Sequence, residues 1–537
     1  MLVPTPSPES RQQFVDDVLH SGADCRLIVA GPGTGKSYLF GKEVEKHPKT
    51  PLVISFLRTL VVEMEPKLGA KAQVRTFHSF CKREFLKLHA DKRPGFRFHY
   101  PPIATILDRD LLLTDESSVS VAREIELAMH GRAEHPLLVR WLQGAERYRA
   151  YGHTDLVYRV LACVEEGDEL PTYPVVIVDE YQDFSPLERA FIERLAEGSP
   201  TLIVGDDDQA LYAFKAAGPD GIRSLYSSGK AKAFSLPYCS RCTTVIVDAV
   251  HTLVAKAKTY GLLANRIDKP FECYTPDKRP ESLTHPKIVH AACSVQKKNT
   301  PHMARYIEEQ IAKIPDEAIE ASWKEGYPSV LVIGPNPFRD QVFDYLQARL
   351  PNVTAKATAD LAVERSDAIR ILAQDPDADL GWRLVCHTWP NLEQHVKAFC
   401  ADGSISLRSL LPAELVDEVL GLVGNWQAYQ NGADVRADEA ESFQGAVGVS
   451  LQEMQPSTDI VESQEEEETG VSTEDRTRPR VLCTSFQGAK GLSADYVFVL
   501  GMNAGHFPRG KVSVSKWHFH TAVVDPSFLE VSNETRN

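Results

Sequence analysis

Two adjacent carboxylates, Asp179 and Glu180, follow an apolar run at residues 175–178. A short run of Val and Ile is typical of a buried strand, and two acids at its end need partners that offset their desolvation. Paired carboxylates in such a place can bind a metal ion and direct a water molecule. The alternative is a purely structural role, which a substrate site nearby would disfavour.

A second segment whose residues could do chemistry is "AGPGTGKSYLF" at residues 30–40, directly after the apolar run "CRLIV". Glycines let successive N–H groups point at phosphate oxygens where a helix begins, a lysine reaches the outer phosphates, and a serine hydroxyl binds Mg²⁺. The residues expected to bind ATP in this loop are Ala30, Gly31, Pro32, Gly33, Thr34, Gly35, Lys36 and Ser37. Ala30 stands where the strict pattern has its first glycine.

This loop could bind a substrate on which the carboxylate pair acts. Asp179 is expected to bind the Mg²⁺ that Ser37 holds, and Glu180 to orient or deprotonate the water that attacks the γ-phosphate. Catalysis is therefore favoured over a structural role for the pair, with ATP and Mg²⁺ as the predicted ligands.

The strands and helices that must position these residues are indicated by apolar runs that alternate with helical patterns. The runs lie at residues 25–31, 51–56, 173–180, 201–206, 329–335, 480–486 and 495–501. Continuous Val/Ile/Leu runs are typical of buried parallel strands, so we expect an α/β protein with two parallel sheets. The predicted division is a first domain at 1–81 and 171–230, a second at 231–360 and 480–537, and mostly helical insertions at 82–170 and 361–479.

The formal net charge of −15 would argue against a nucleic-acid partner if it were spread evenly. Thirteen acidic residues and one arginine between Asp434 and Asp475 account for −12 of it. This stretch has a single aromatic residue, Phe443, and is predicted to be a disordered linker at 434–476. The nearly neutral remainder is compatible with local basic grooves.

Nothing in the sequence predicts a membrane segment or a secretory leader. The first residues are polar and rich in proline, and no run approaches about 18 apolar residues. The ten cysteines are scattered, and only Cys239 and Cys242 form a CxxC motif, which lacks the second pair that a zinc site needs. We therefore expect a cytoplasmic protein.

Seven segments occur in a distinctive order. They are "SRQQFV" at 10–15, "SFLRTLVVEM" at 55–64, "TFHSF" at 76–80, "VDEYQD" at 178–183, "VGDDDQALYAFKAAG" at 204–218, "LPYCSRCTTVIVDAV" at 236–250 and "SFQGAKGLSADYVFVLG" at 485–501. Together with the phosphate loop this order resembles superfamily 1A, the UvrD-like DNA helicases, over most of the chain. The resemblance implies two RecA-like P-loop domains with parallel sheets, each carrying an inserted, mostly helical subdomain.

The resemblance also implies roles for individual residues. Gln12, or its neighbour Gln13, would read adenine; Gln209 would sense the γ-phosphate; and Arg241 would reach that phosphate from the second domain. The residues implied for single-stranded DNA, by stacking or by phosphate contact, are Phe56, Arg58, Thr76, His78, Tyr212, Phe214, Lys215 and Lys490.

The chain also departs from the family pattern. Lys215 replaces an arginine, Ser493 replaces a glutamate near the ribose, and Ser240 replaces a tyrosine that stacks on adenine, although Tyr238 is close. The family's motif VI, whose arginine is a second γ-phosphate contact, has no recognisable counterpart. Arg536 lies near the expected distance, but a frayed tail is the favoured interpretation.

The resulting expectation is an ATP-dependent DNA helicase, a repair-type motor that moves 3′ to 5′ on single-stranded DNA or at single/double-strand junctions. One alternative is a nucleotide-gated single-stranded-DNA-binding protein with little motor activity, and another is a shortened relative whose missing motif is supplied by a partner or lost. A protein partner could bind the insertions or the acidic stretch. A nuclease fusion is disfavoured because the sequence has no convincing Asp…Glu-x-Lys cluster, and an RNA-directed relative is disfavoured by "DEYQD", which resembles the DNA branch.

Overall fold

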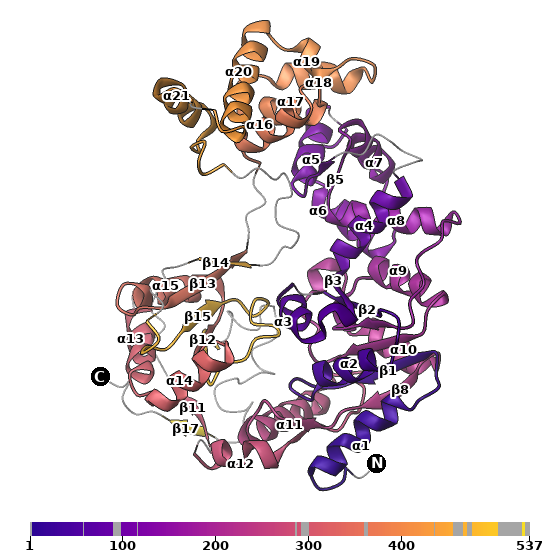
Figure 1. Ribbon diagram of the computed structural model, residues 1–537, viewed down its shortest axis with the longest axis vertical. Coiled ribbons are helices and arrows are strands. Elements are labelled where there is room, and N and C mark those ends of the chain that lie inside the picture. The colour runs from indigo at the N-terminus through magenta and orange to yellow at the C-terminus, as the bar shows by residue number, and fades with distance from the viewer. Residues whose placement is uncertain are drawn as a thin grey trace.

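The structure is a computed structural model in which two sheets lie near one end and a group of helices lies at the other (Figure 1). It describes residues 3–56, 58–89, 98–114, 116–284, 287–291, 300–358, 363–433, 435–454, 466–469, 475–502 and 529–531, a few of these by their backbone alone. No described helix is both long enough and apolar enough to cross a membrane.

The first sheet has six parallel strands in the order β3-β2-β6-β7-β1-β8. Their bounds are Gln73–Thr76 (β3), Leu52–Ser55 (β2), Val176–Val178 (β6), Thr201–Gly205 (β7), Cys25–Val29 (β1) and Lys232–Ser235 (β8). The central strands are buried on both faces, as their apolar runs predict. Because β8 pairs with β1, the predicted domain boundary at 230/231 is wrong, and the first sheet continues to Ser235.

Helices cover both faces of this sheet. They are α1 (Pro8–Leu19), α2 (Lys36–Glu45), α3 (Arg58–Leu68), α4 (Phe77–His89), α8 (His153–Glu165), α9 (Pro186–Glu197) and α10 (Asp220–Ser228). A capping box fixes the start of α9, where Glu188 accepts from the Ser185 N–H at 2.7 Å. The predicted insertion at 82–170 therefore has the wrong bounds, because α4 runs through residue 82 and α8 packs into the core of the first sheet.

The second sheet has the order β14-β13-β15-β12-β16, parallel except for β14. The strands are Glu466–Thr469 (β14), Val353–Thr358 (β13), Val481–Thr484 (β15), Val330–Ile333 (β12) and Tyr496–Val499 (β16). Three helices pack against it, namely α13 (Thr300–Ile311), α14 (Asp316–Glu325) and α15 (Asn336–Gln347). The chain thus forms two parallel-stranded α/β sheets, as the sequence predicts.

The segment between the sheets lies against the first of them. It contains β9 (Tyr238–Cys239), α11 (Thr244–Thr259), β10 (Glu272–Cys273), α12 (Thr275–Thr284) and β11 (Ile288–His290), which pairs with β17 (Leu529–Val531). The backbone N–H of Ser240 donates to the Gly33 carbonyl at 2.9 Å. This contact joins the segment to the loop between β1 and α2.

The remaining helices form one group, here called the helical body, at the top of Figure 1. It consists of β4 (Phe98–His99), α5 (Ile103–Leu113), α6 (Ala122–Gly131), α7 (Leu138–Arg147), β5 (Ala150–Tyr151), α16 (Arg365–Gln374), α17 (Asp379–Thr388), α18 (Glu393–Ala401), α19 (Leu407–Leu410), α20 (Ala413–Gln430) and α21 (Ala437–Val447). Both predicted insertions contribute to a single hydrophobic core in this body, so they are not two separate subdomains.

The predicted disordered linker at 434–476 is wrong for much of its length. Residues 437–447 form α21, and Phe443, Val447, Leu451 and Met454 are buried in the helical body. Residues 466–469 form β14, which pairs with β13. The apolar residues are spaced at helical intervals between the acids, so the acidic side chains face outward while the helix docks.

Candidate nucleotide and nucleic-acid site

The loop between β1 and α2 has the backbone conformation of a phosphate cradle. Gly33 and Gly35 have φ angles of 68° and 95°, in the region that glycine adopts without strain. The Thr34 hydroxyl donates to the Gly31 carbonyl at 2.9 Å and closes the loop. Since α2 begins at Lys36, its first N–H groups have no partner within the helix and can bind an anion. Ala30 differs from the other loop residues because its N–H donates to Gly205 in the sheet.

Lys36 and the carboxylate pair meet at the ends of β1 and β6. The Lys36 ammonium lies 3.1 Å from Glu180 Oε1, and both carboxylates are buried, with 4% of Asp179 and 6% of Glu180 exposed. Glu180 itself has a φ of 54°, which is rare for a residue with a side chain. The Gln182 amide donates to the other Glu180 oxygen at 2.5 Å. Lys36, which is expected to bind ATP, thus lies beside Glu180, which is expected to be catalytic, and Glu180 directly follows Asp179, which is expected to bind Mg²⁺.

The charges of this group depend on one another. Burial, reinforced by the Glu180 charge, raises the pKa of Asp179 to about 7. Burial also disfavours the Glu180 carboxylate, but the ammonium groups of Lys36 and Lys490 hold its pKa at about 2. Burial opposes the charge of Lys36 as well, yet the adjacent carboxylates leave its pKa above the ordinary value. Glu180 is therefore ionised and paired, while Asp179 can hold a proton near neutral pH.

Lys490 reaches this site from the second sheet. Its ammonium forms an ion pair with Asp183, lies 3.6 Å from Glu180 Oε2, and donates to the Gln209 carbonyl at 3.0 Å. The side chain is buried. The prediction that Lys490 contacts a DNA phosphate does not describe this conformation, because its charge is already neutralised by the carboxylates of the first sheet.

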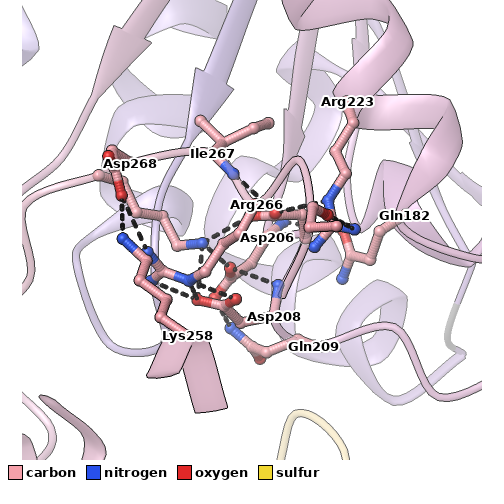
Figure 2. Close-up of polar contacts among 12 residues, drawn as sticks. Gln182, Asp206, Asp208, Gln209, Arg223, Lys258, Arg266, Ile267 and Asp268 are labelled. Atoms are coloured by element: carbon pink, nitrogen blue, oxygen red, sulfur yellow. Dashed lines mark hydrogen bonds and ion pairs between the residues drawn. The ribbon is translucent and has the colours of Figure 1, made fainter. Parts of the chain in front are cut away.

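Gln209 lies in a network of charges on the loop after β7. Its side-chain amide donates to Asp206 at 2.5 Å, and the Asp206 N–H donates to the Gln182 side chain at 3.0 Å. A chain of hydrogen bonds therefore runs from Glu180 through Gln182 and Asp206 to Gln209. Figure 2 shows Gln182, Asp206 and Gln209 of this chain, with Arg223 and Arg266 nearby.

Three basic residues neutralise the acidic triplet Asp206–Asp208. The Lys269 ammonium lies 2.7, 2.6 and 2.8 Å from the carboxylates of Asp206, Asp207 and Asp208. Arg223 pairs with Asp207 at 2.9 Å, and Arg266 pairs with Asp208 at 2.7 Å (Figure 2). The triplet has the spacing of a metal site, but the ammonium of Lys269 lies among its carboxylates. Sequence reasoning missed Lys269 because a lone lysine in "RIDKPF" carries no recognisable signal.

Other predicted nucleotide contacts lie around the loop. Arg241 packs its Cβ against the loop so closely that a methyl group at Gly33 would lie 2.3 Å away, and its side chain is exposed. Ser37 is also exposed, and Gln12 accepts from the Tyr38 hydroxyl at 3.3 Å. Tyr238 is buried and its hydroxyl donates to the Pro4 carbonyl at 2.5 Å, so it offers no free ring to adenine.

The residues predicted to contact DNA divide into three groups. Phe56 and Tyr212 form an aromatic pair with ring centroids 5.0 Å apart. Thr76, His78 and Lys215 point inward instead: Thr76 accepts from the Ser79 N–H, His78 lies 3.6 Å from Glu188, and burial lowers the pKa of Lys215. The side chains of Arg58 and Phe214 lie outside the described part of the structure, as does Arg536.

Four histidines lie behind this aromatic pair, a feature that the sequence did not predict. The ring of His153 lies between those of His78 and His99, with centroid distances of 5.5 and 4.9 Å, and His130 contacts Ser185 and Thr154. Burial lowers the pKa of His99 to about 4 and, with Lys215 adding to it, that of His130 to about 3. These histidines come from four separate segments, so only the fold brings them together.

Known proteins resemble this chain in part. Residues 131–230 match the family described as UvrD/REP helicase N-terminal domain. The putative ATP-dependent DNA helicase YjcD of Bacillus subtilis is 26% identical over 310 residues, which cover 48% of this chain and 40% of that protein. The ATP-dependent DNA helicase PcrA of Staphylococcus epidermidis is 25% identical over 275 residues, 42% of this chain and 37% of that protein. The RecBCD enzyme subunit RecB of Mycolicibacterium smegmatis is 38% identical over 118 residues, 20% of this chain and 11% of that protein.

The chain thus spans about two fifths or less of the length of these relatives. The matched domain includes the carboxylate pair of β6 and Gln209, which the structure joins to the phosphate loop through Lys36 and Gln182. Geometry and similarity therefore agree, and the chain is similar to the UvrD-like helicases of superfamily 1A.

Proposed function

We propose that this chain is an ATP-driven DNA motor in which two RecA-like domains bind ATP·Mg²⁺ between them. The single observation that carries the proposal is that Lys36 and Lys490, one from each sheet, hold the same carboxylate, Glu180, at 3.1 and 3.6 Å. A nucleotide whose terminal phosphate attracts Lys36 would change the contacts of both sheets at once.

Each residue has a role in this proposal. Lys36 would leave Glu180 for the outer phosphates, which frees Glu180 to take the proton of the attacking water. Gln209 would report the change along the hydrogen bonds through Asp206 and Gln182, and Arg241 would turn its exposed guanidinium toward the γ-phosphate.

The donors present fit a Mg²⁺ ion, which prefers carboxylate and hydroxyl oxygens. Asp179 offers a buried carboxylate, and Ser37 an exposed hydroxyl on the first turn of α2. Bound there, the ion would supply charge neutralisation to the phosphates.

We further propose single-stranded DNA, alone or at a duplex junction, as the polymer that is moved. The pair of Phe56 and Tyr212 supports this because aromatic faces stack on any base. Movement from 3′ to 5′ is the direction that the family resemblance implies. Since relatives include subunits named for the RecBCD enzyme, a protein partner for the helical body is part of the proposal.

The test compares Lys36→Ala and Glu180→Gln with Lys42→Ala, a control on the outer part of the same helix. Lys36→Ala is expected to lose nucleotide binding. Glu180→Gln is expected to bind nucleotide but to lose at least about 10²-fold in turnover, the usual contribution of a general base. The measurements are titration with a fluorescent ATP analogue and ATPase rates with and without oligo(dT).

Unchanged ATPase in either variant would contradict the assignment. Strong DNA stimulation of the unaltered chain would exclude the alternative of a nucleotide-gated binding protein. If instead ATP changes the affinity for oligo(dT) without turnover, that alternative replaces the motor.

A further inference from the structure

Three cysteines lie beside the phosphate loop. Cys239 on β9 and Cys273 on β10 are paired neighbours in two parallel strands, and Cys242 lies two residues before α11 begins. Cys239 and Cys273 are buried, whereas Cys242 is half-buried. The three sulfurs belong to a small hydrophobic cluster with Phe271 and Val247.

Cys239 and Cys242 are hydrogen-bonded to each other. The Cys242 N–H donates to Cys239 Sγ at 3.3 Å, and the Cys242 thiol donates to the same sulfur. The thiol hydrogen bond is the main reason why the pKa of Cys239 falls to about 6, and it raises the pKa of Cys242 correspondingly. The pair therefore holds one proton near neutral pH, and a thiolate is the reactive form of cysteine.

The third cysteine takes no part in this hydrogen bond. The Cys273 thiol donates to the Cys242 carbonyl at 3.4 Å, and burial raises its pKa. Cys273 is thus a fixed thiol, while the other two share a charge.

The turn that joins the pair is packed on the phosphate loop. A methyl group at Gly33 would lie 3.2 Å from Cys239 Sγ and 2.3 Å from Arg241 Cβ. The Ser240 N–H donates to Gly33 as well. A covalent bond between the two sulfurs would close a ring around Ser240 and Arg241, the residues that contact the loop.

We propose that Cys239 and Cys242 form a thiol-modification site in which a peroxide oxidises the pair to a disulfide that disables the adjoining phosphate loop. The lowered pKa places the charge on Cys239, and the half-buried Cys242 lies beside it. The Cys239 thiolate attacks a peroxide oxygen and releases hydroxide, which gives a sulfenic acid. The Cys242 thiol then attacks this sulfur, the S–S bond forms, and water leaves with the thiol proton. Two thiols lose two electrons to the O–O bond of one peroxide.

The disulfide itself is tested by peptide mass. Trypsin cleaves after Lys232, Arg241 and Lys256, so a disulfide would join peptides 233–241 and 242–256 into one species that dithiothreitol separates. After hydrogen peroxide and alkylation, we expect this species in the unaltered chain and in Cys400→Ser, a control with a half-buried cysteine elsewhere. We expect none in Cys239→Ser or Cys242→Ser. Absence of the species in the unaltered chain, or a link from Cys239 to Cys273, overturns the proposal.

The functional half rests on the proposed ATP site and has its own measurement. Oxidation is expected to weaken ATP binding or slow turnover at least tenfold, with recovery in dithiothreitol, and Cys242→Ser should keep its activity in peroxide. A disulfide that leaves binding and turnover unchanged overturns the disabling effect. If the reduced chain binds no ATP, the proposed function fails, while the peptide mass still decides the thiol chemistry.

Discussion

Lysines from both sheets hold the carboxylates at the end of β6. A buried charge that loses its partner costs about 3–5 kcal/mol, so Glu180 cannot release both Lys36 and Lys490 unless other charges replace them. In the proposed function, a triphosphate would provide such a replacement by attracting a lysine while its cation approaches Asp179. The residues proposed to bind the ligand are then the same residues that pair with one another in this structure, which would give a physical reason for coupling between the sheets.

Buried histidines give the protein a predicted sensitivity to acid. Burial, with help from His99, lowers the pKa of His153 to about 3, and neither of its buried ring nitrogens has a hydrogen-bond partner among the described residues. The unfolded chain binds a proton below a pKa of about 6.5, whereas the folded chain does not, so stability falls as the pH falls through this range. For His153 alone, the free energy of unfolding at pH 5 is lowered by about 2 kcal/mol.

The variant His153→Phe removes this titration and keeps an aromatic ring. Between pH 7.5 and pH 5, its free energy of unfolding should therefore fall by about 2 kcal/mol less than that of the unaltered chain. Urea unfolding at the two pH values measures the difference. Comparison between variants is needed because burial raises the pKa values of Glu126 and Glu188 nearby, and Lys215 and Lys82 also face the cluster. Equal losses in both proteins would contradict the prediction, and the exposed His20→Gln is the control.

At the scale of elements, the loop that joins α11 to β10 serves two sites. Residues 266–271 bring Lys269 into the acidic triplet, and Phe271 against Gly31, where a methyl group would lie 2.6 Å from the ring. One short segment therefore fixes both the loop after β7 and the phosphate loop. Because Asp206 also holds Gln209, the position of this segment sets that of the proposed γ-phosphate sensor.

Lys269→Met should weaken both stability and turnover. It leaves buried carboxylates without a charge partner, which costs about 3–5 kcal/mol, and it frees Asp206 from its position. We expect kcat to fall more than KM rises, with part of the loss restored in Lys269→Arg. ATPase assays and urea unfolding measure the two effects. Lys258→Met, which removes an exposed pair with Asp268 nearby, is the control and should cost less than about 1 kcal/mol; equal behaviour of the two variants would refute the assigned role.

Elements with strong local patterns were predictable from the sequence, and elements that depend on docking were not. The sequences of β1, β2, β6 and β7 are mostly apolar, and such runs are enough to predict buried strands. In α21 the only large apolar residues are Phe443 and Val447, and they stabilise the helix only where a core exists to receive them. Likewise Lys36 and Glu180 stand in recognisable motifs, but Lys269 and His153 acquire their roles from distant neighbours.

At the scale of the molecule, the two insertions behave as one body. Tyr100 donates to Asp367 at 3.0 Å, and Arg383 donates to Asp110 at 2.8 Å while the Tyr148 hydroxyl donates to the other Asp110 oxygen at 2.5 Å. The contacts of Tyr100 and Arg383 join segments more than 250 residues apart in sequence, whereas the Tyr148 contact lies within the first insertion. No local pattern encodes such pairs, which explains why the sequence predicted two subdomains. Since α17 and α18 pack on α5 of the first insertion (Figure 1), the helical body would move as one unit if the two sheets moved relative to each other.

The variant Arg383→Met tests whether the two insertions in the helical body unfold cooperatively. The variant leaves Asp110 buried without its cation, which costs about 3–5 kcal/mol, and in a single core the cost appears on both sides of the interface. Amide hydrogen exchange should therefore accelerate in 103–147 and in 365–447 together. Arg109→Met removes an exposed pair with Glu393 at the same interface and should cost less than about 1 kcal/mol without accelerating either segment. Acceleration confined to 365–447 in Arg383→Met would show that the insertions unfold separately, because a shared core cannot lose a buried ion pair on one side alone.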